Sequence, residues 1–257
     1  MRHPHVSRPV SAAPPAVPLV AVAHGSRDPR AAATVESLME AVRLARPEVP
    51  VRAAYLDHAA PTLAGALSEL TEAVVLPLLL TEAYHSRVDI PGALAEASAR
   101  RPRLRVRRGT TLGPHPLLID ALERRLAEAG VAAGDPGTAV VLLSAGSSDH
   151  RANATVAGIA RRWAGRGWWS VSAAYASAAA PTPEDEVRRL LAAGAPRVVV
   201  APYLLAPGYF ADKTRAAALA AGAEVVADVL GAAPEVSAVL LERYEQALRT
   251  GERSASA

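Results

Sequence analysis

Short apolar runs alternate with segments of helical periodicity along the first half of the chain. The first run, residues 19–23, contains only Leu, Val and Ala and ends at a His-Gly-Ser turn at 24–26. Asp28 and Pro29 then favour a helix start, because a carboxylate caps free backbone N–H groups and proline lacks the N–H that the first turn leaves unpaired. The following apolar side chains have the spacing of one helix face, at Val35, Leu38, Met39 and Val42. The pattern predicts a buried strand, a tight turn and a helix.

The same alternation continues to about residue 130. Apolar runs predict further strands over residues 51–56, 73–80 and 104–107. Helical spacing predicts further helices near residues 63–70, over 91–99 and near 118–126. The run at 73–80 is continuous, which is typical of a strand buried on both faces. This order of strands and helices predicts a parallel sheet covered by helices.

The pattern begins again in the second half of the chain. Residues 144–151, Ser-Ala-Gly-Ser-Ser-Asp-His-Arg, align with residues 23–30, Ala-His-Gly-Ser-Arg-Asp-Pro-Arg. An Ala-Tyr pair followed by Ala-Ala-Pro-Thr occurs both at 54–62 and at 174–182. Such ordered matches, at a constant lag of about 120 residues, indicate that one α/β unit is duplicated within the chain.

The duplication sets the expected organisation. The fold class is α/β, with two duplicated parallel-sheet halves. The expected segments are a disordered tail (1–17), an α/β domain that carries the active site (18–130), a linker (131–137), a degenerate second α/β domain (138–249) and a tail (250–257). A chain with two such units can act as its own pseudo-dimer, so a monomer is consistent with the sequence.

Composition restricts the chemistry. The 257 residues include no cysteine, so a bound metal is limited to histidine nitrogen and carboxylate oxygen. The net charge is +3 and no basic stretch is interleaved with aromatic residues, so nucleic acid is not an expected partner. No apolar run reaches about 18 residues and no secretory signal pattern is present, so no membrane partner and a cytoplasmic location are expected. The absence of P-loop and G-x-G-x-x-G motifs predicts no organic cofactor.

Side chains that can bind metal occur in the first copy only. His24, Asp57, His85 and His115 align with Ala145, Ser177, Phe210 and Ala233 of the second copy. His24, Asp57 and His85 follow the first three predicted strands, and the carboxyl ends of parallel strands open on one edge of a sheet. Two imidazoles and one carboxylate at that edge predict a divalent metal site with open positions. The alternative is that they are three unrelated loop residues.

Three motifs together resemble one known family. They are His-Gly-Ser-Arg-Asp-Pro at 24–29, Ala-Tyr-Leu-Asp at 54–57 with Ala-Pro-Thr at 60–62, and Leu-Leu-Thr-Glu-Ala-Tyr-His at 79–85 with Asp-Ile-Pro at 89–91. In this combination the chain is similar to the sirohydrochlorin chelatases of the CbiX and SirB type. The resemblance runs over residues 17–129 and continues in degenerate form to residue 248.

The resemblance implies an enzyme that inserts Fe²⁺ or Co²⁺, as the substrate metal, into sirohydrochlorin, a tetrapyrrole with eight carboxylates. It implies the class II chelatase fold, in which two α/β halves face each other across a cleft. It assigns metal binding to His24, Asp57 and His85, with proton removal by the two histidines. The family usually has Glu where this chain has Asp57, which leaves open whether Asp57 binds metal directly or through water.

The residues agree with that chemistry. Metal insertion replaces two pyrrole N–H protons with one divalent ion, and a neutral imidazole can both bind metal and accept a proton. Arg27, Arg30 and Arg87 lie beside the histidines in sequence, where they can pair with substrate carboxylates. The alternative is that they are solvated charges at helix starts. Lys213 and Arg215 are candidates for the opposite side of the cleft.

Two function classes stay open from the sequence. The first is a chelatase of siroheme or cobalamin biosynthesis, and the second is a carrier that binds tetrapyrrole or metal without turnover. A histidine phosphatase is disfavoured, because those enzymes carry Arg directly before the histidine, where this chain has Ala23. Ligand type does not separate iron from cobalt. Iron is favoured here, since no His-rich or Cys-bearing tract of the kind found in some cobalt-pathway relatives is present.

Overall fold

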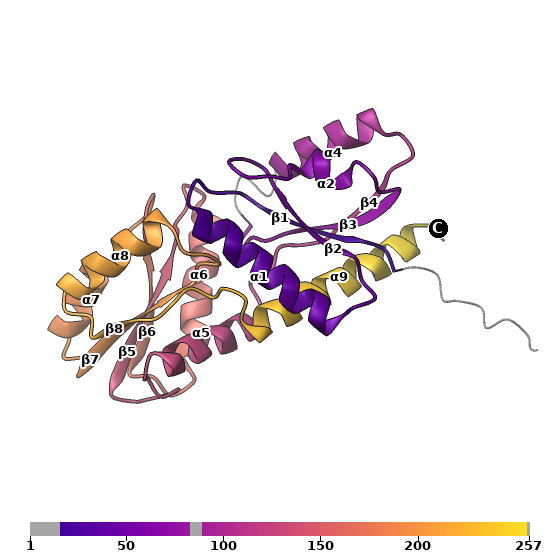
Figure 1. Cartoon of the computed structure of the whole chain (residues 1–257). Helices are drawn as coiled ribbons and strands as arrows, with labels where there is room; N and C mark the ends of the chain where they lie inside the picture. The colour runs from indigo at the N-terminus through magenta and orange to yellow at the C-terminus, as the bar shows by residue number, and fades with distance from the viewer. Residues whose placement is uncertain (1–15, 83–88, 256–257) are drawn as a thin grey trace, which may run out of the picture.

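The computed structural model describes residues 16–82 and 89–255, with side chains up to residue 250. The first half contains β1 (Leu19–Ala23), α1 (Pro29–Ala45), β2 (Val51–Tyr55), α2 (Leu63–Leu67), β3 (Glu72–Pro77), α4 (Asp89–Arg100), β4 (Arg105–Arg108) and α5 (Pro116–Glu128). The second half contains β5 (Thr138–Ser144), α6 (His150–Ala164), β6 (Ser170–Tyr175), α7 (Pro183–Ala192), β7 (Arg197–Pro202), α8 (Tyr209–Ala220), β8 (Val225–Val226) and α9 (Pro234–Ala255). Figure 1 shows the two halves side by side.

Each half is built on a four-stranded parallel sheet with the same strand order. The orders are β2-β1-β3-β4 and β6-β5-β7-β8. In both sheets the second strand lies on one side of the first strand, and the third and fourth strands lie on the other side. The order of connection therefore switches sides at the first strand, and ligands bind at such switch points in open α/β sheets. The predicted parallel α/β fold and its duplication are therefore confirmed.

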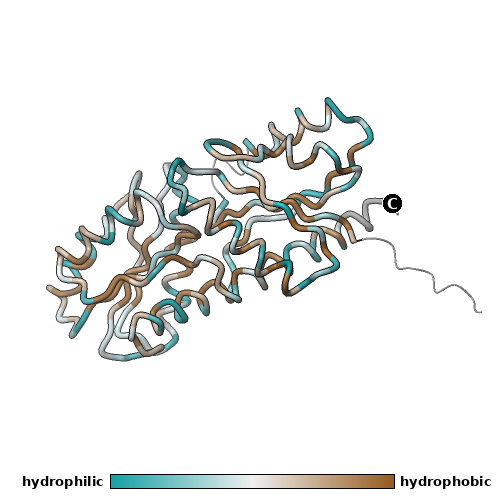
Figure 2. The backbone as a smooth tube through the Cα atoms, viewed as in Figure 1, coloured by the Kyte–Doolittle hydropathy of each residue, from teal (hydrophilic) through white to brown (hydrophobic). Residues whose placement is uncertain are grey.

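Strand alternation divides the core into an inner layer shared by both halves and two outer layers. Leu19 and Ala21 of β1 face the shared core, whereas Val20 and Val22 face the outer core beneath α2 and α4. The shared core contains buried residues of both halves, and the tube in Figure 2 is most hydrophobic along the strands. Because one continuous core joins the halves, separating them exposes apolar surface to water.

The last helix of each half packs on the sheet of the other half. Helix α9, at the end of the chain, contacts β3 and α1 of the first half, and α5 contacts β7 of the second half (Figure 1). The Tyr244 hydroxyl of α9 donates a hydrogen bond to the Val17 carbonyl at 2.6 Å, and Trp163 Nε1 of α6 donates to Glu123 of α5 at 2.8 Å. The sequence places each final helix after its own half, but in space the two helices are exchanged.

Two predicted elements are shorter in the structure. Helix α2 ends at Leu67 rather than near residue 70. Strand β3 ends at Pro77, although the apolar run continues to Leu80. Residues 78–80 lie beyond the end of the strand, where they line the cleft between the halves. The apolar run is therefore longer than the strand, because its first part is buried in the sheet and its last three residues line the cleft.

None of the helices in the described part of the chain is long and apolar enough to cross a membrane.

Candidate active site

The turn after β1 places His24 beside Asp57. The Asp57 N–H donates a hydrogen bond to the His24 carbonyl at 3.0 Å, which continues the β1–β2 pairing by one step. Gly25 has φ +96°, and a Cβ on it would lie 1.7 Å from the Asp57 carbonyl oxygen. Only glycine permits this approach, since any side chain would collide with the neighbouring backbone. The predicted adjacency of these two strand ends is therefore built into the backbone.

The second half repeats this turn without the metal-capable side chains. The Ser177 N–H donates to the Ala145 carbonyl at 3.0 Å, and Gly146 has φ +82°. A Cβ on Gly146 would lie 1.9 Å from the Ser177 carbonyl oxygen. The turn belongs to the fold, whereas the imidazole of His24 and the carboxylate of Asp57 are additions that the fold does not need.

Helix α1 starts as the sequence predicts. Asp28 is its N-cap and accepts a hydrogen bond from the Arg30 N–H at 2.9 Å. The hydroxyl of Ser26 in turn accepts a hydrogen bond from the Asp28 N–H at 3.1 Å. Hydrogen bonds from the Arg30 side chain hold the pKa of the Asp28 carboxyl below its ordinary value. The side chains around the His-Gly-Ser turn are thus tied to the helix start that follows it.

The Asp57 carboxylate is exposed and pairs with the next residue. One oxygen accepts a hydrogen bond from the His58 N–H at 2.7 Å, and the other lies 3.2 Å from His58 Nε2. His58 has φ +60°, a conformation shared by its counterpart Ala178. This backbone conformation turns the His58 ring back over the carboxylate instead of away from it.

Within residues 16–82 and 89–255, no group of three His, Asp or Glu side chains lies close enough to hold a metal ion. His85, the third predicted ligand, lies outside the described residues, as does Arg87. The described part of the site therefore contributes His24 and the Asp57–His58 pair.

His24 lies in a cleft between the halves. Two cavities of about 300 and 350 Å³ adjoin each other there. Both are lined by His24, Leu78, Leu79, Ala145, Leu204 and Leu205, so each wall comes from a different half. Of the described side chains that line them, His24 is the one imidazole and none is a carboxylate. A mostly apolar cleft with a few polar groups, one of them an imidazole, suits a large organic ligand.

Equivalent hydrogen bonds hold the two leucine walls in place. The Leu78 N–H donates to the Val22 carbonyl at 2.7 Å, and the Tyr203 N–H donates to the Leu143 carbonyl at the same distance. The buried Tyr203 hydroxyl crosses to the first half and donates to the Leu80 carbonyl at 3.1 Å. Burial raises the pKa of this phenol above its ordinary range, so it stays a protonated donor.

Asn153 is a site-lining residue that the sequence analysis did not identify. Its side-chain carbonyl accepts from the Ser147 N–H at 3.1 Å, and its amide donates to the Ser147 carbonyl at 2.7 Å. This pair of hydrogen bonds fixes the loop after β5, which forms the second-half wall of one cavity. The sequence carries no signal for this role. Asn153 looks like an ordinary helix residue, because its partner Ser147 is six positions away and outside the helix.

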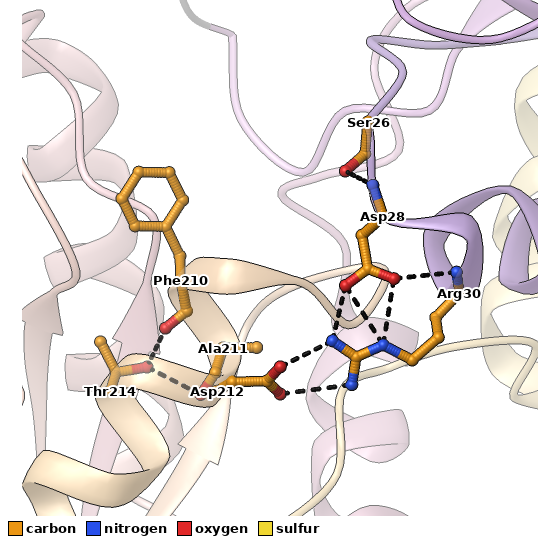
Figure 3. Close-up of polar contacts among 7 residues, drawn as sticks. All are labelled: Ser26, Asp28, Arg30, Phe210, Ala211, Asp212 and Thr214. Atoms are coloured by element: carbon orange, nitrogen blue, oxygen red, sulfur yellow. Dashed lines mark hydrogen bonds and ion pairs between the residues drawn. The ribbon is translucent and has the colours of Figure 1, made fainter.

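Arg30 and Arg27 differ in their surroundings. The Arg30 guanidinium pairs with Asp28 of its own helix start and with Asp212 of α8 in the other half, the latter at 2.6 Å (Figure 3). These hydrogen bonds, donated to Asp28 first and then to Asp212, raise the pKa of Arg30 above its ordinary value. Arg27 is exposed on the turn. Arg30 therefore bridges the two halves at the rim of the cleft.

The structure corrects the expectation for Arg215 and assigns contacts to His115, whose role the sequence left open. Arg215 donates to the Val226 and Ala227 carbonyls and pairs with Asp228, so it holds the edge of its own sheet and not the cleft. His115 caps α5 by accepting from the Leu117 N–H at 3.3 Å, and its Nε2 lies 3.0 Å from Glu242 of α9. These contacts give His115 a structural role, although an alanine, Ala233, occupies the equivalent position in the second half. Lys213 is exposed on α8.

Two duplicated α/β halves around an apolar cleft, with one imidazole at the end of the first strand, define a class that is represented among solved structures. SirB from Bacillus subtilis with Fe³⁺ superposes with a TM-score of 0.78 at 22% identity, covering 92% of this chain and 97% of that one. CbiX, described as the terminal enzyme for siroheme biosynthesis in denitrifying bacteria, gives 0.68 at 24% identity, covering 89% and 98%. At these identities the likeness shows the fold, which is that of the two-half chelatases.

A family model described as CbiX matches residues 18–129 and again residues 139–247, and the chain belongs to this family. The double match confirms the duplication. A sirohydrochlorin cobaltochelatase of Priestia megaterium is 30% identical over 73% of this chain and 63% of its own length, so the match spans less than two thirds of that relative. A sirohydrochlorin ferrochelatase of the same organism is 28% identical over 76% of this chain and 75% of its own.

Proposed function

We propose that this chain is a sirohydrochlorin chelatase, which inserts a divalent metal ion into the tetrapyrrole. The observation that carries the proposal is the position of His24: the one imidazole among the described residues that line the apolar cleft between the halves. Family membership and the chelatase names of the relatives support the same activity. The resemblance seen in the sequence motifs leads to this proposal as well.

The proposed reaction exchanges two pyrrole protons for one metal ion. The His24 imidazole binds the incoming ion in the cleft and accepts a proton as the ion enters the ring. The Asp57 carboxylate, one strand away, offsets the positive charge of the ion, directly or through a water molecule. His85 is proposed as the second imidazole, which accepts the second pyrrole proton. The apolar leucine walls exclude water from the flat ring, while its carboxylates extend to the rim of the cleft.

The metal is a substrate in this proposal, and Fe²⁺ is favoured over Co²⁺ on the absence of a His-rich or Cys-bearing tract in the sequence. Both ions accept the nitrogen and oxygen ligands that this chain offers. The two relatives reported above carry one name of each kind. Ligand type therefore does not identify the metal, and insertion rates must be measured for both ions.

The test is an anaerobic assay of the purified chain with sirohydrochlorin. We expect the absorbance change of metal insertion to be accelerated on adding Fe²⁺ or Co²⁺, relative to a control without enzyme. The ratio of kcat/KM values then ranks the two metals. A spectral shift on binding without any acceleration would instead support a carrier. The absence of both the acceleration and the spectral shift would contradict the proposal.

Arg30 and Asp212 are expected to have opposite effects on substrate affinity. If Arg30 exchanges Asp212 for a substrate carboxylate, Arg30→Gln raises KM roughly fivefold, since a charged hydrogen bond to substrate is lost. Asp212→Asn lowers KM roughly twofold, because it removes a competitor for the guanidinium. The pair is half-exposed, so melting temperatures change little. Steady-state kinetics measure both effects.

The matched control for this pair is Asp228→Asn. It breaks a comparable surface pair with Arg215 that lies away from the cleft cavities, and it is expected to leave KM unchanged. An increase in KM for Asp212→Asn would show that the bridge positions α8 and that Arg30 does not change partners.

A further inference from the structure

Helix α8 begins with two aromatic side chains that are exposed to solvent. Tyr209 is 70% exposed and Phe210 is 48% exposed, and their rings meet edge to face with centroids 5.8 Å apart. Phe210 is the single phenylalanine of a chain in which only 4% of residues are aromatic. Burying such a ring is worth more than burying most side chains, so its exposure calls for an occupant that covers it.

Both rings line the same cavity as His24. The cavity of about 350 Å³ is bounded by His24 and Gly25 on the first half and by Tyr209 and Phe210 on the second. Other large apolar side chains with high exposure, such as Leu44 and Leu219, line neither of the two cleft cavities. The exposed aromatic surface therefore coincides with the cleft.

The backbone that carries the rings is fixed from two sides. The buried hydroxyl of Thr214 donates to the Phe210 carbonyl at 2.6 Å and to the Ala211 carbonyl at 3.2 Å. Asp212 pairs with Arg30 of the first half. Figure 3 shows the Phe210 ring pointing away from Thr214 and from the axis of α8. The rings are thus held at the cleft and not folded back into the core.

We infer that Tyr209 and Phe210 form a stacking surface for the flat face of the tetrapyrrole. This inference rests on the proposed function. A metal ion enters the macrocycle from one face, and His24 lies on the wall that meets this face. The protein must hold the remaining surface of the macrocycle by apolar contacts. Aromatic rings do this well, because they offer large area and favourable ring–ring geometry.

The two halves of the chain then have separate tasks. The first half carries the metal-binding side chains, and the second half, which has Phe210 where the first has His85, binds the macrocycle. Tyr209 and Phe210 are positioning residues for the substrate and have no part in metal binding. The second half then differs from the first in its task and does not merely lack the histidines.

The experiment compares substitutions that keep or remove a flat ring at position 210. The variants are Phe210→Leu, Phe210→Trp and the double change Tyr209→Ala with Phe210→Ala. The control is Leu219→Ala, on the same helix, where the side chain is 45% exposed and outside the cleft cavities. The Kd of sirohydrochlorin is measured anaerobically from its absorbance, and the Kd of Co²⁺ alone by calorimetry.

We expect Phe210→Leu to weaken sirohydrochlorin binding roughly tenfold, although leucine retains apolar area, because it has no flat face. Phe210→Trp retains the wild-type Kd, and the double variant binds sirohydrochlorin more weakly than Phe210→Leu does. The Kd of Co²⁺, the melting temperature and the Leu219→Ala protein stay at wild-type values. In turnover the loss appears in KM more than in kcat.

Wild-type affinity of the Phe210→Leu variant would overturn the inference. A parallel loss of Co²⁺ affinity or of melting temperature would also overturn it, since it would assign the ring a structural role. A wild-type chain that does not bind sirohydrochlorin would overturn the proposed function itself. The two failures are therefore distinguished by the wild-type measurement alone.

Discussion

Replacing His24 with alanine is expected to reduce kcat/KM for metal insertion by at least about a hundredfold, with the fold unchanged. The loss follows from removing a metal ligand and a proton acceptor in one substitution. The fold is expected to survive because the second half has alanine, Ala145, at the same position of the same turn. The same turn therefore already folds in this chain with alanine at the position of the histidine.

The measurement is the anaerobic insertion assay, with circular dichroism and a melting curve for each protein. His150→Ala is the matched control, since it removes an exposed histidine at the start of α6, the counterpart of α1. It is expected to retain wild-type turnover. His85→Ala is expected to behave as His24→Ala does. Wild-type turnover of folded His24→Ala would contradict the site assignment.

Replacing Gly25 with alanine is expected to lower the free energy of unfolding by about 3 kcal/mol, from the positive φ together with the collision with the Asp57 carbonyl. For a domain of this size such a loss lowers the melting temperature by roughly 6–12 °C. Gly146→Ala meets the same collision with Ser177 in the second half and is expected to cost about as much.

Gly130→Ala separates the two causes of that loss. Gly130 has φ +82°, but a Cβ there would meet no atom within 4 Å, so only the backbone strain applies. We expect it to cost about 1 kcal/mol. Equal melting temperatures for Gly25→Ala and Gly130→Ala would show that the chain is not as close to Asp57 as the structure places it.

The two turn variants are also expected to differ in activity. At a temperature where both are folded, Gly25→Ala reduces turnover, because it displaces His24 from Asp57. Gly146→Ala moves only Ala145 and Ser177, which carry no metal-binding group, so its folded fraction has turnover close to that of the wild type. Insertion rates per folded molecule, taken below both melting transitions, measure this difference. Equal activity losses would contradict the assignment of the metal chemistry to the first half.

Much of the fold was predictable because it is local. The β1 run, the Asp28 cap and the helical spacing of α1 involve residues within a few positions of each other, and all are confirmed. The duplication was predictable because it is a comparison of the sequence with itself. The expected metal edge depends on a general property of parallel sheets, and the structure places His24 and Asp57 at that edge.

The sequence by itself therefore determined the order of strands and helices, the first helix, the two-fold repetition and which side chains are chemically able to bind metal. Only the tertiary structure decided that α5 and α9 are exchanged between the halves, that Arg30 pairs with Asp212, and that Tyr209 and Phe210 face the cavity of His24. These contacts join residues that lie far apart in the chain, as Arg30 and Asp212 do at a separation of 182 positions. Periodicity and spacing report short-range preferences, whereas such contacts depend on how both halves pack around one shared core.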